Sequence, residues 1–360
     1  MSSGTTAASV ADKIAQVVLD IPQAGHFDFA APGIGPGDVG RMAIVPMGAS
    51  RRAGLIVGIA DSSQVERSKL RALLHIQRAW PALGERDLAL LRFCAGYYHA
   101  PLGVVALAAC PPAMRTTRAV HLDPDFLVSL TALGLREAGS LPRHAARLRG
   151  VVEALADGPR PESLLRARQP HAAASIRALV ERGWVARAVA DPAEDHASRR
   201  LQVASGPTLN ADQQAAFDAV RSALGQPHAC LLDGITGSGK TEVYLRLVAE
   251  TLQRGSQALI LLPEINLTPQ FLQRIEARFP DARIRVQHSG MADGARLAGY
   301  LDAQTGVADV VIGTRLAVFT PMPRLGLIVV DEEHDASFKQ ETGLRYSARD
   351  LAMVRAREAG

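Results

Sequence analysis

Cysteine is scarce in this 360-residue sequence, which contains only Cys94, Cys110 and Cys230. The three residues are far apart, each lies in an apolar stretch, and no two of them form a C-x-x-C pair. A disulfide framework of the kind found in small secreted proteins is therefore excluded, and so is a zinc site built from paired cysteines. We predict three buried, reduced thiols in a cytoplasmic protein.

Long apolar runs are also missing. The sequence has no run of about 18 apolar residues, so no transmembrane helix and no membrane partner are predicted. The N-terminal string MSSGTTAASVADK has no basic segment followed by an apolar core, which argues against a secretory signal peptide. With 48 % hydrophobic residues, a chain of this length predicts a soluble globular protein of two or three domains.

Lysine is almost absent, because four lysines stand against 36 arginines. One of the four, Lys240, belongs to the string GITGSGKT at residues 234–241, which fits the phosphate-loop pattern G-x-x-x-x-G-K-S/T at every fixed position. The apolar run Cys230–Leu232 before it is typical of a short buried parallel strand, and a helical pattern follows it. The sequence therefore predicts a strand, a phosphate-binding loop and a helix.

Each part of such a loop has a chemical role. Backbone N–H groups and the helix N-terminus bind phosphate oxygens, Lys240 reaches the β- and γ-phosphates, and the Thr241 hydroxyl ligates Mg²⁺. The predicted cofactors are thus ATP and Mg²⁺. The predicted ATP-binding residues of the loop are Gly234, Gly237, Ser238, Gly239, Lys240 and Thr241.

The charge is unevenly distributed. Residues 1–200 hold 24 basic and 18 acidic side chains, whereas residues 201–360 hold 16 and 18. A basic first half ahead of a nucleotide-binding half suggests a polyanionic partner that binds the N-terminal part.

Short strands separated by Gly and Pro are predicted in the first 60 residues, at 16–20, 41–45 and 54–59. The string Gly35–Gly40 satisfies G-x-G-x-x-G, but Pro36 lies inside it and a strand follows it. A dinucleotide site requires a helix at that point, so we reject this motif as a cofactor site. Residues 85–99 predict a helix.

The middle of the chain predicts three short helices, near Leu148–Leu155, at Glu162–Arg168 and at Ala172–Glu181, and then a hairpin starting at Gly183. This layout is typical of the winged-helix variant of the helix-turn-helix. Such domains bind DNA in many proteins and mediate protein contacts in others. The polar residues 191–207 predict a linker.

Strand-like runs alternate with helical stretches beyond residue 207, at Ala258–Leu262, Ile284–Val286, Val310–Ile312 and Leu327–Val330. This alternation predicts an α/β fold, a parallel sheet with helices on both faces.

The last of these strands runs into Asp331-Glu332-Glu333-His334. At the carboxyl end of a parallel strand, Asp331 is placed to hold the Mg²⁺ that bridges the phosphates, and Glu332 to orient and deprotonate the attacking water. After a phosphate loop, this acidic string predicts ATP hydrolysis, with Lys240, Asp331 and Glu332 as the catalytic residues.

Four strings together resemble the PriA family of bacterial replication-restart helicases, also called primosomal protein N′, in helicase superfamily 2. They are LLDGITGSGKTEVYL, LLPEINLTPQ, GTRLAVFTP and LIVVDEEHDASFKQETGLRYSARDLA, and the likeness is nearly continuous over residues 209–353. It implies an ATP-dependent 3′-to-5′ DNA helicase that recognises stalled forks and initiates primosome assembly. The implied partners are forked DNA with a nascent 3′-OH end, single-stranded DNA, single-stranded DNA-binding protein and other primosome proteins, and the implied location is the nucleoid.

In the helicase part, the resemblance implies that Gln213 reads the adenine and that His334 couples the ATP site to DNA. Leu262–Ile265 and Gly313–Arg315 would touch the tracked strand. An aromatic-rich loop that senses single-stranded DNA would contribute Phe338, Lys339, Arg345 and Tyr346, through stacking and phosphate contacts.

The family's first domain binds the 3′ end of a nascent strand. Its aromatic–Asp–aromatic triplet corresponds to Phe27-Asp28-Phe29, its V-P-F-G to Val45–Gly48, and its basic contact to Arg71. Asp28 can accept a hydrogen bond from a free 3′-OH, whereas a continuing phosphodiester would be repelled by the carboxylate. The flanking rings are expected to hold the terminal base. Phe29, Met47 and Arg71 replace the family's usual Tyr, Phe and Lys.

The resemblance implies a multidomain chain. A small, mostly-β DNA-end-binding domain is expected at residues 1–112, a winged-helix domain at 113–190, a linker at 191–207 and a RecA-like helicase lobe at 208–360. The sequence stops before the family's G-S-A-T motif, so the second lobe, its arginine finger and its zinc-binding cysteines are not in it. We therefore expect no zinc site in these residues and little ATP turnover by them alone.

Two other functions stay open at this point. The chain could be another superfamily 2 translocase, such as a restriction or remodelling motor, although the F-D-F triplet and the YYHAPLG segment argue against it. It could also be a non-enzymatic module that binds forked DNA and carries ATP without hydrolysing it.

Overall fold

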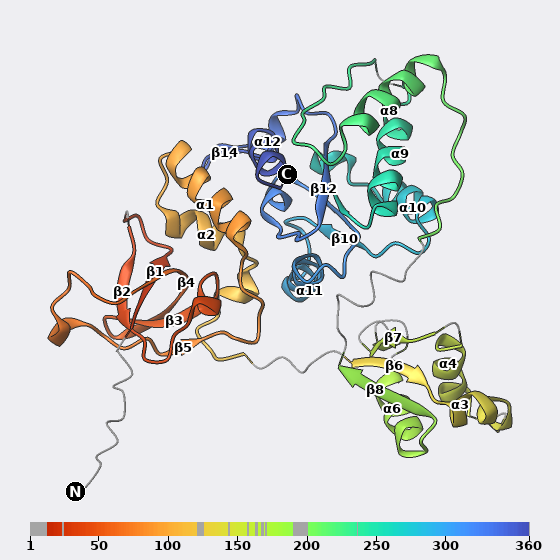
Figure 1. Ribbon diagram of the computed structural model, residues 1–360, viewed down its shortest axis with the longest axis horizontal. Helices are drawn as coiled ribbons and strands as arrows, with labels where there is room; N and C mark the ends of the chain where they lie inside the picture. Colours follow the sequence, from red (N-terminus) through yellow and green to blue (C-terminus); the bar gives the residue numbers. More distant parts are fainter. Residues whose placement is uncertain are drawn as a thin grey trace, which may run out of the picture. The chain divides into compact units, whose positions relative to one another are not determined.

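The structure is a computed structural model that describes residues 13–23, 25–120, 126–142, 145–156, 158–162, 165–166, 169, 171–189, 201–235 and 237–359. The chain forms two compact units. One combines residues 1–120 with residues 196–360, and the other consists of residues 121–195 (Figure 1). Among the described residues, no helix combines the length and the apolar character needed to cross a membrane.

An antiparallel sheet of five strands in the order β2-β1-β4-β3-β5 opens the first unit. The strands are β1 (Ile14–Leu19), β2 (Phe27–Ala30), β3 (Met42–Met47), β4 (Ser50–Ala60) and β5 (His75–Ile76). The strands predicted at 16–20 and 41–45 overlap β1 and β3 except for one residue each, and the strand predicted at 54–59 falls within β4. Alternating side chains of β1 lie on opposite faces, so Val17 packs in one apolar cluster and Val18 in another.

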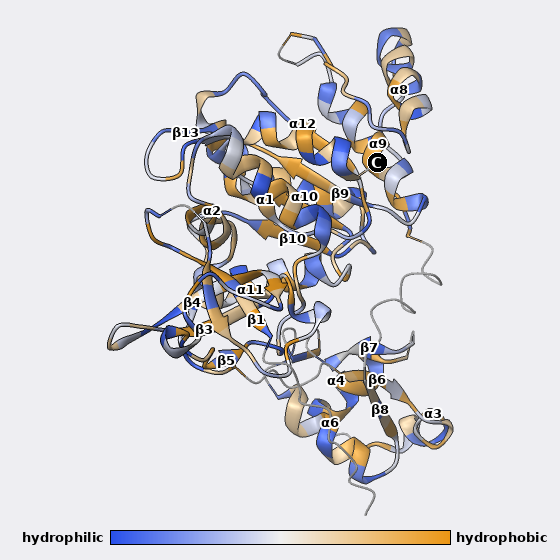
Figure 2. Ribbon diagram, turned by 60° about the vertical axis from the view of Figure 1, so that its left-hand side comes forward, coloured by the Kyte–Doolittle hydropathy of each residue, from blue (hydrophilic) through white to orange (hydrophobic). Residues whose placement is uncertain are grey.

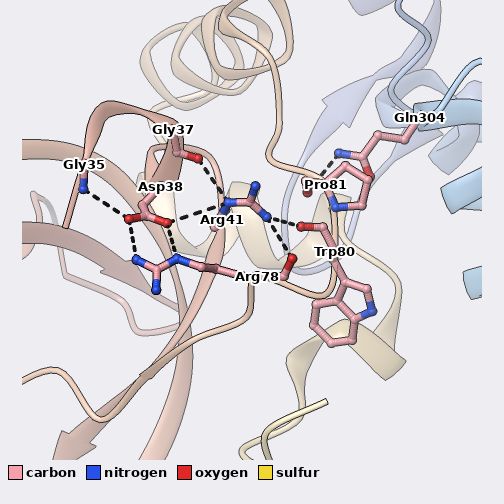
Figure 3. A network of polar contacts seen from close by, with 8 residues as sticks. All are labelled: Gly35, Gly37, Asp38, Arg41, Arg78, Trp80, Pro81 and Gln304. Carbon is pink, nitrogen blue, oxygen red and sulfur yellow. Dashed lines mark hydrogen bonds and ion pairs between the residues drawn. The ribbon is translucent and has the colours of Figure 1, made fainter. Parts of the chain in front are cut away.

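The rejected glycine motif forms a 3₁₀ turn, η1 (Pro36–Asp38), and the next element is strand β3. Asp38 accepts hydrogen bonds from the Gly35 N–H at 3.1 Å and from two nitrogens of Arg78 at 2.8 Å (Figure 3). These bonds, the one from Arg78 above all, lower the pKa of the Asp38 carboxyl. The motif therefore anchors a structural ion pair.

Helices α1 (Glu85–Tyr97) and α2 (Leu102–Ala109) join the sheet to the C-terminal part of the unit. Leu91 of α1, Val105 of α2 and Leu351 of α12 (Ala348–Ala359) share one hydrophobic cluster. The Gln304 side-chain amide donates to the carbonyl of Pro81 at 3.2 Å (Figure 3) and to that of Ala82 at 3.0 Å. The N-terminal sheet and the C-terminal part of the unit thus share a continuous core.

A parallel sheet of four strands in the order β10-β11-β9-β12 forms the centre of the C-terminal part. All four strands occur where the sequence predicts them, and Figure 2 shows the central strands in hydrophobic colours. The further elements of this lobe are α8 (Ala211–Ala223), α9 (Lys240–Gln253), β9 (Gln257–Leu261), η5 (Glu264–Asn266), α10 (Pro269–Arg278), β10 (Ile284–Gln287), α11 (Asp293–Gln304), β11 (Val310–Gly313), η6 (Arg315–Phe319), β12 (Leu325–Val330), η7 (Ala336–Phe338), β13 (Lys339–Gln340) and β14 (Tyr346–Ser347).

The prediction of a strand at Cys230–Leu232 is wrong. These residues form no strand, and Leu231 is 78 % exposed. A three-residue apolar run is a weak strand signal without the hydrogen bonds of a neighbouring strand, and residues 230–232 belong to none of the strands of the sheet. The prediction of three buried thiols is wrong at Cys230, which is exposed, whereas burial raises the pKa of Cys94 to about 12 and of Cys110 to about 11.

Residues 201–207, the described end of the predicted linker, pack on the C-terminal part of the unit that contains the parallel sheet. Leu201 and Val203 contact its core, and the Ala204 N–H donates to the Arg278 carbonyl at 2.9 Å. Arg246 donates to the Pro207 carbonyl at 2.6 Å. The other residues of the predicted linker lie outside the described part.

The second unit holds a three-stranded antiparallel sheet in the order β7-β6-β8 with helices around one apolar cluster. Its elements are β6 (Phe126–Leu130), α3 (Ala132–Glu137), η4 (Ala138–Ser140), α4 (Ala146–Ala154), β7 (Arg160–Pro161), α6 (Ala172–Glu181) and β8 (Val185–Val189). Helices α4 and α6 lie where the first and third helices are predicted. The predicted helix 162–168 lies partly outside the described residues, and so do the residues that a hairpin after β8 would need.

Candidate nucleotide and DNA sites

The phosphate loop is built around two glycines in the left-handed region, Gly237 at φ +83° and Gly239 at φ +85°. Gly239 is the residue before α9, so Lys240 and Thr241 are its first two residues. The Lys240 ammonium donates to the carbonyls of Gly234 and Ile235, the second at 3.3 Å. Positive φ values and a helix N-terminus direct backbone N–H groups to one point, which is the geometry of a phosphate site.

Gln213 contacts the same loop. Its side-chain amide donates to the Ser238 carbonyl at 2.8 Å, and its Oε1 accepts from the Asn210 N–H at the start of α8. A Cβ on Gly239 would lie 2.4 Å from Gln213 Nε2 and would displace that side chain, and the φ of +85° at Gly239 itself favours glycine. The structure thereby brings two predicted parts of the ATP site together.

Asp331 follows β12, and its backbone N–H donates to the Leu261 carbonyl of the neighbouring strand β9. Its Oδ2 accepts a hydrogen bond from the Tyr244 hydroxyl at 3.1 Å. Thr241 lies three residues before Tyr244 on α9, about one helical turn away. Tyr244 therefore lies beside both residues predicted to ligate Mg²⁺. Sequence reasoning missed it, although it lies three residues after Thr241 on the same helical face.

A magnesium ion suits the donor set at this point. The Thr241 hydroxyl and the Asp331 carboxylate are oxygen ligands of the type that Mg²⁺ prefers, and Tyr244, one turn after Thr241 on α9, hydrogen-bonds to Asp331. The residues present therefore fit the metal that a phosphate loop implies.

Glu332 adopts φ of +50°, a strained conformation for a residue with a Cβ. Its carboxylate lies 3.7 Å from Nε2 of the exposed His334. The next residue, Glu333, pairs instead with Arg349 at 2.9 Å. The predicted base and the predicted coupling residue are thus neighbours, on a turn that points Glu332 and Glu333 to different partners.

An open pocket of about 640 Å³ lies at the carboxyl ends of β9 and β11. Glu264 and Ile265 of the predicted strand-contacting motif line it, and so do Thr314 and Arg315 of the second such motif. The Arg315 guanidinium donates to the carbonyls of Ser337 and Lys339, at 2.9 and 3.2 Å. Both motifs therefore face one space.

Two of the predicted loop aromatics turn inward. Phe338 is 2 % exposed and Tyr346 is 4 % exposed, with the Tyr346 ring edge-on to Phe319 at 5.2 Å between centroids. Neither ring presents a face for a base to stack on, because both pack in the core. Lys339 and Arg345 are exposed and leave the charged half of the predicted loop available.

Asp28 of the predicted DNA-end residues lies on the edge strand β2, and Gly48 lies in the turn between β3 and β4. Oδ2 of Asp28 accepts a hydrogen bond from Ser63, whereas its buried Oδ1 has no hydrogen-bond donor in the described part of the chain and lies 3.4 Å from His26 Nε2. The exposed Arg71 donates to the Gly48 carbonyl at 2.9 Å, so these two predicted residues meet.

The rings of Phe27 and Phe29 do not flank Asp28. Strand alternation places them on the opposite face of β2, where both contact the core and Phe29 is only 5 % exposed. The ring of Phe29 is therefore too buried for the predicted contact with the terminal base.

Two family models match the chain. Residues 16–111 match the 3′DNA-binding domain (3′BD) of PriA, and residues 210–358 match the DEAD/DEAH box helicase domain. The first range contains the five-stranded sheet with Asp28, and the second contains the phosphate loop, Asp331 and Arg315.

Curated relatives named replication restart protein PriA also match. The protein of Haemophilus influenzae is 34 % identical over 359 residues, which cover 96 % of this chain and 48 % of that protein. Those of Synechocystis and Bacillus subtilis are 36 % and 33 % identical over 75 % and 61 % of this chain, and over 30 % and 28 % of their own lengths. The chain thus spans about half or less of the length of these relatives. The chain has a 3′DNA-binding domain followed by a helicase domain, and its likeness to PriA proteins extends along its length. It therefore belongs to the PriA family, of which it represents the N-terminal portion.

Proposed function

We propose that this chain binds DNA with a free 3′-OH end through its N-terminal domain and Mg·ATP through its helicase lobe. It would do so as part of an ATP-dependent 3′-to-5′ helicase that recognises stalled forks and initiates primosome assembly. The observation that carries the proposal is the buried Oδ1 of Asp28, which has no hydrogen-bond donor among the described residues. It lies in the range that matches a 3′ DNA-binding domain.

The Oδ1 carboxylate oxygen of Asp28 is suited to bind an alcohol such as a 3′-OH. A carboxylate oxygen with a free lone pair accepts a hydrogen bond from a 3′-OH, and a bond to a charged group contributes about 1.5–3 kcal/mol. A 3′-phosphate in the same place would bring two negative charges together. Arg71 beside Gly48 offers a cation for the phosphodiester on the 5′ side of the terminal sugar.

In the helicase lobe, Lys240 would leave its carbonyl partners for the phosphates, and Thr241 and Asp331 would hold the metal. Bound Mg²⁺ would neutralise charge on the phosphate oxygens. Glu332 would orient the attacking water and take its proton. His334, which lies beside Glu332, would couple the ATP site to bound DNA. Fork recognition would then come from the first domain and strand binding from the second.

A competition experiment tests the end-binding proposal. Forks that end in 3′-OH compete against forks that end in 3′-phosphate for the whole chain, for Asp28→Ala and for the exposed control Asp20→Ala. We expect the parent chain and the control to prefer 3′-OH by about tenfold or more, and Asp28→Ala to lose most of that preference. An unchanged ratio in Asp28→Ala would show that Asp28 does not read the end.

A further inference from the structure

A residue of the N-terminal part reaches the pocket of the helicase lobe. Arg115 lines the 640 Å³ pocket together with Arg315, although Arg315 lies inside the range that matches the helicase domain and Arg115 lies far before it, just after the range that matches the 3′DNA-binding domain. It also lines a smaller pocket of about 60 Å³, together with His288 and Arg296. Arg115 therefore lies at the boundary between two adjoining spaces that both contain basic side chains.

The position of Arg115 is fixed by its backbone. It is the last residue of the turn η3 (Pro112–Arg115), which Pro111 precedes and Pro112 begins. Met114 of this turn is 3 % exposed and packs in the shared core. Nη2 of Arg115 donates to the Cys110 carbonyl at 3.0 Å. A side chain held by a rigid turn loses little conformational freedom when it binds a ligand.

Within the described residues Arg115 forms no ion pair with a carboxylate, and its buried Nε has no hydrogen-bond acceptor. Two carboxylates line the same pocket without pairing with Arg115 in the described part of the chain: Glu264 accepts from the Ser289 hydroxyl and Asp335 from the Ser337 N–H. Arg115 thus lacks the anion that a half-buried guanidinium ordinarily has.

The rest of the lining suits a nucleotide. Ile265, which is 78 % exposed, and Leu316 offer apolar surface to a base, and hydroxyls such as Thr314 and Thr342 offer polar contacts to a sugar and phosphate. The volume is that of a small-ligand site that is open on one side.

We propose that Arg115 binds a backbone phosphate of single-stranded DNA that lies in this pocket, so that the N-terminal region contributes directly to strand binding by the helicase lobe. The proposal rests on the proposed function, because it assumes that the pocket with Arg315 is the strand site. It adds a contact from outside the helicase domain, and it gives the fixed turn η3 a role in holding the strand.

The test measures binding of an oligo(dT) whose 3′ end is blocked by a phosphate, so that the Asp28 site contributes nothing. Fluorescence anisotropy at several salt concentrations compares the chain with Arg115→Gln, Arg315→Gln and Arg118→Gln. Arg118 is the matched control, because it is exposed, lies three residues further on and does not line the pocket. We expect Arg115→Gln to weaken binding about tenfold and to reduce the slope of log K against log salt by about 0.7.

The outcomes separate the two proposals. If Arg315→Gln weakens binding and Arg115→Gln behaves like Arg118→Gln, the inference about Arg115 is wrong and the strand site stands. If neither Arg315→Gln nor Arg115→Gln weakens binding, the pocket is not the strand site, and both the strand-site proposal and the inference about Arg115 are wrong.

A second measurement on the unchanged chain covers the case in which Arg115→Gln does not fold. Oligo(dT) should then protect Arg115, and not Arg118, from modification by phenylglyoxal, and equal modification of Arg115 with and without DNA would overturn the inference.

Discussion

The hydroxyl of Tyr244 donates a hydrogen bond to Oδ2 of Asp331 across 3.1 Å. The two residues are 87 positions apart in the sequence, one on the first turns of α9 and the other directly after β12. Burial, together with the neighbouring Asp331 charge, raises the pKa of Tyr244 above its ordinary value. The phenol therefore stays protonated and remains a donor over the working pH range, which fixes the carboxylate beside the phosphate loop.

The first prediction concerns this hydrogen bond. Tyr244→Phe keeps the ring and its packing, so the free energy of unfolding should fall by no more than about 1.5 kcal/mol. Asp331 would lose its orientation, and the Mg²⁺ concentration for half-maximal nucleotide binding should rise about tenfold, as for other residues that hold a metal ligand in place. Titrating Mg²⁺ at constant fluorescent nucleotide measures this. The control is Tyr300→Phe, a buried tyrosine elsewhere in the unit, and equal Mg²⁺ curves for the two variants would contradict the prediction.

The second prediction is that Lys240→Ala abolishes measurable binding of fluorescent ATP. Lys240 is the ammonium that lies over the loop carbonyls, and no other lysine occurs between Lys69 and Lys339 to replace it. Lys69→Ala serves as the matched control, since Lys69 is exposed and pairs with Glu66 in the N-terminal domain. Equal nucleotide binding by the parent chain and Lys240→Ala would refute the assignment of the loop.

The third prediction is a pH dependence of stability. Hydrogen bonding to Arg78 lowers the pKa of Asp38 below its ordinary value of 3.8, so the folded state favours the charged form. The stabilisation is present above that value and is lost as the pH falls below it. Asp38→Asn should cost about 1–3 kcal/mol at neutral pH, and the difference from the parent chain should shrink under acid. Denaturant unfolding of the parent, Asp38→Asn and the exposed control Asp20→Asn, each at several pH values, provides the comparison. A difference that is independent of pH would exclude Asp38 as its source.

The fourth prediction tests the segment before the phosphate loop. Leu231 is 78 % exposed, so Leu231→Ser should change the free energy of unfolding by no more than about 0.5 kcal/mol. Leu245 in α9 is 1 % exposed, and Leu245→Ala should cost about 2–5 kcal/mol. Denaturant titration of both variants measures the two costs. A loss comparable to that of Leu245→Ala in the Leu231 variant would mean that residues 230–232 form a buried strand after all.

The sequence predicted those features that depend on local pattern. The phosphate loop is specified by glycines and a lysine at fixed spacing, and the strands of the parallel sheet by apolar runs between helices, so both occur where expected. Phe338 and Tyr346 were expected to meet DNA because aromatics mark such loops, but their burial depends on Phe319 and on α12, which local sequence does not report. The same reason explains why the sequence did not point to Tyr244 and Arg115. Tyr244 bonds to Asp331 and Arg115 lines a pocket with Arg315, and in both cases only the folded structure brings the two residues together.

The shared core has a consequence for biosynthesis. Helix α2 ends at Ala109, and α12, which contributes to the same apolar cluster, begins at Ala348. A ribosome that adds roughly 5–20 residues per second delivers α12 on the order of 10–50 seconds after α2. During that interval residues 121–195 can complete their own separate unit, while the apolar side of α1 and α2 waits without its partner. The nascent chain therefore exposes the apolar side of α1 and α2 throughout that interval, and the N-terminal domain reaches its final packing only after α12 has been made.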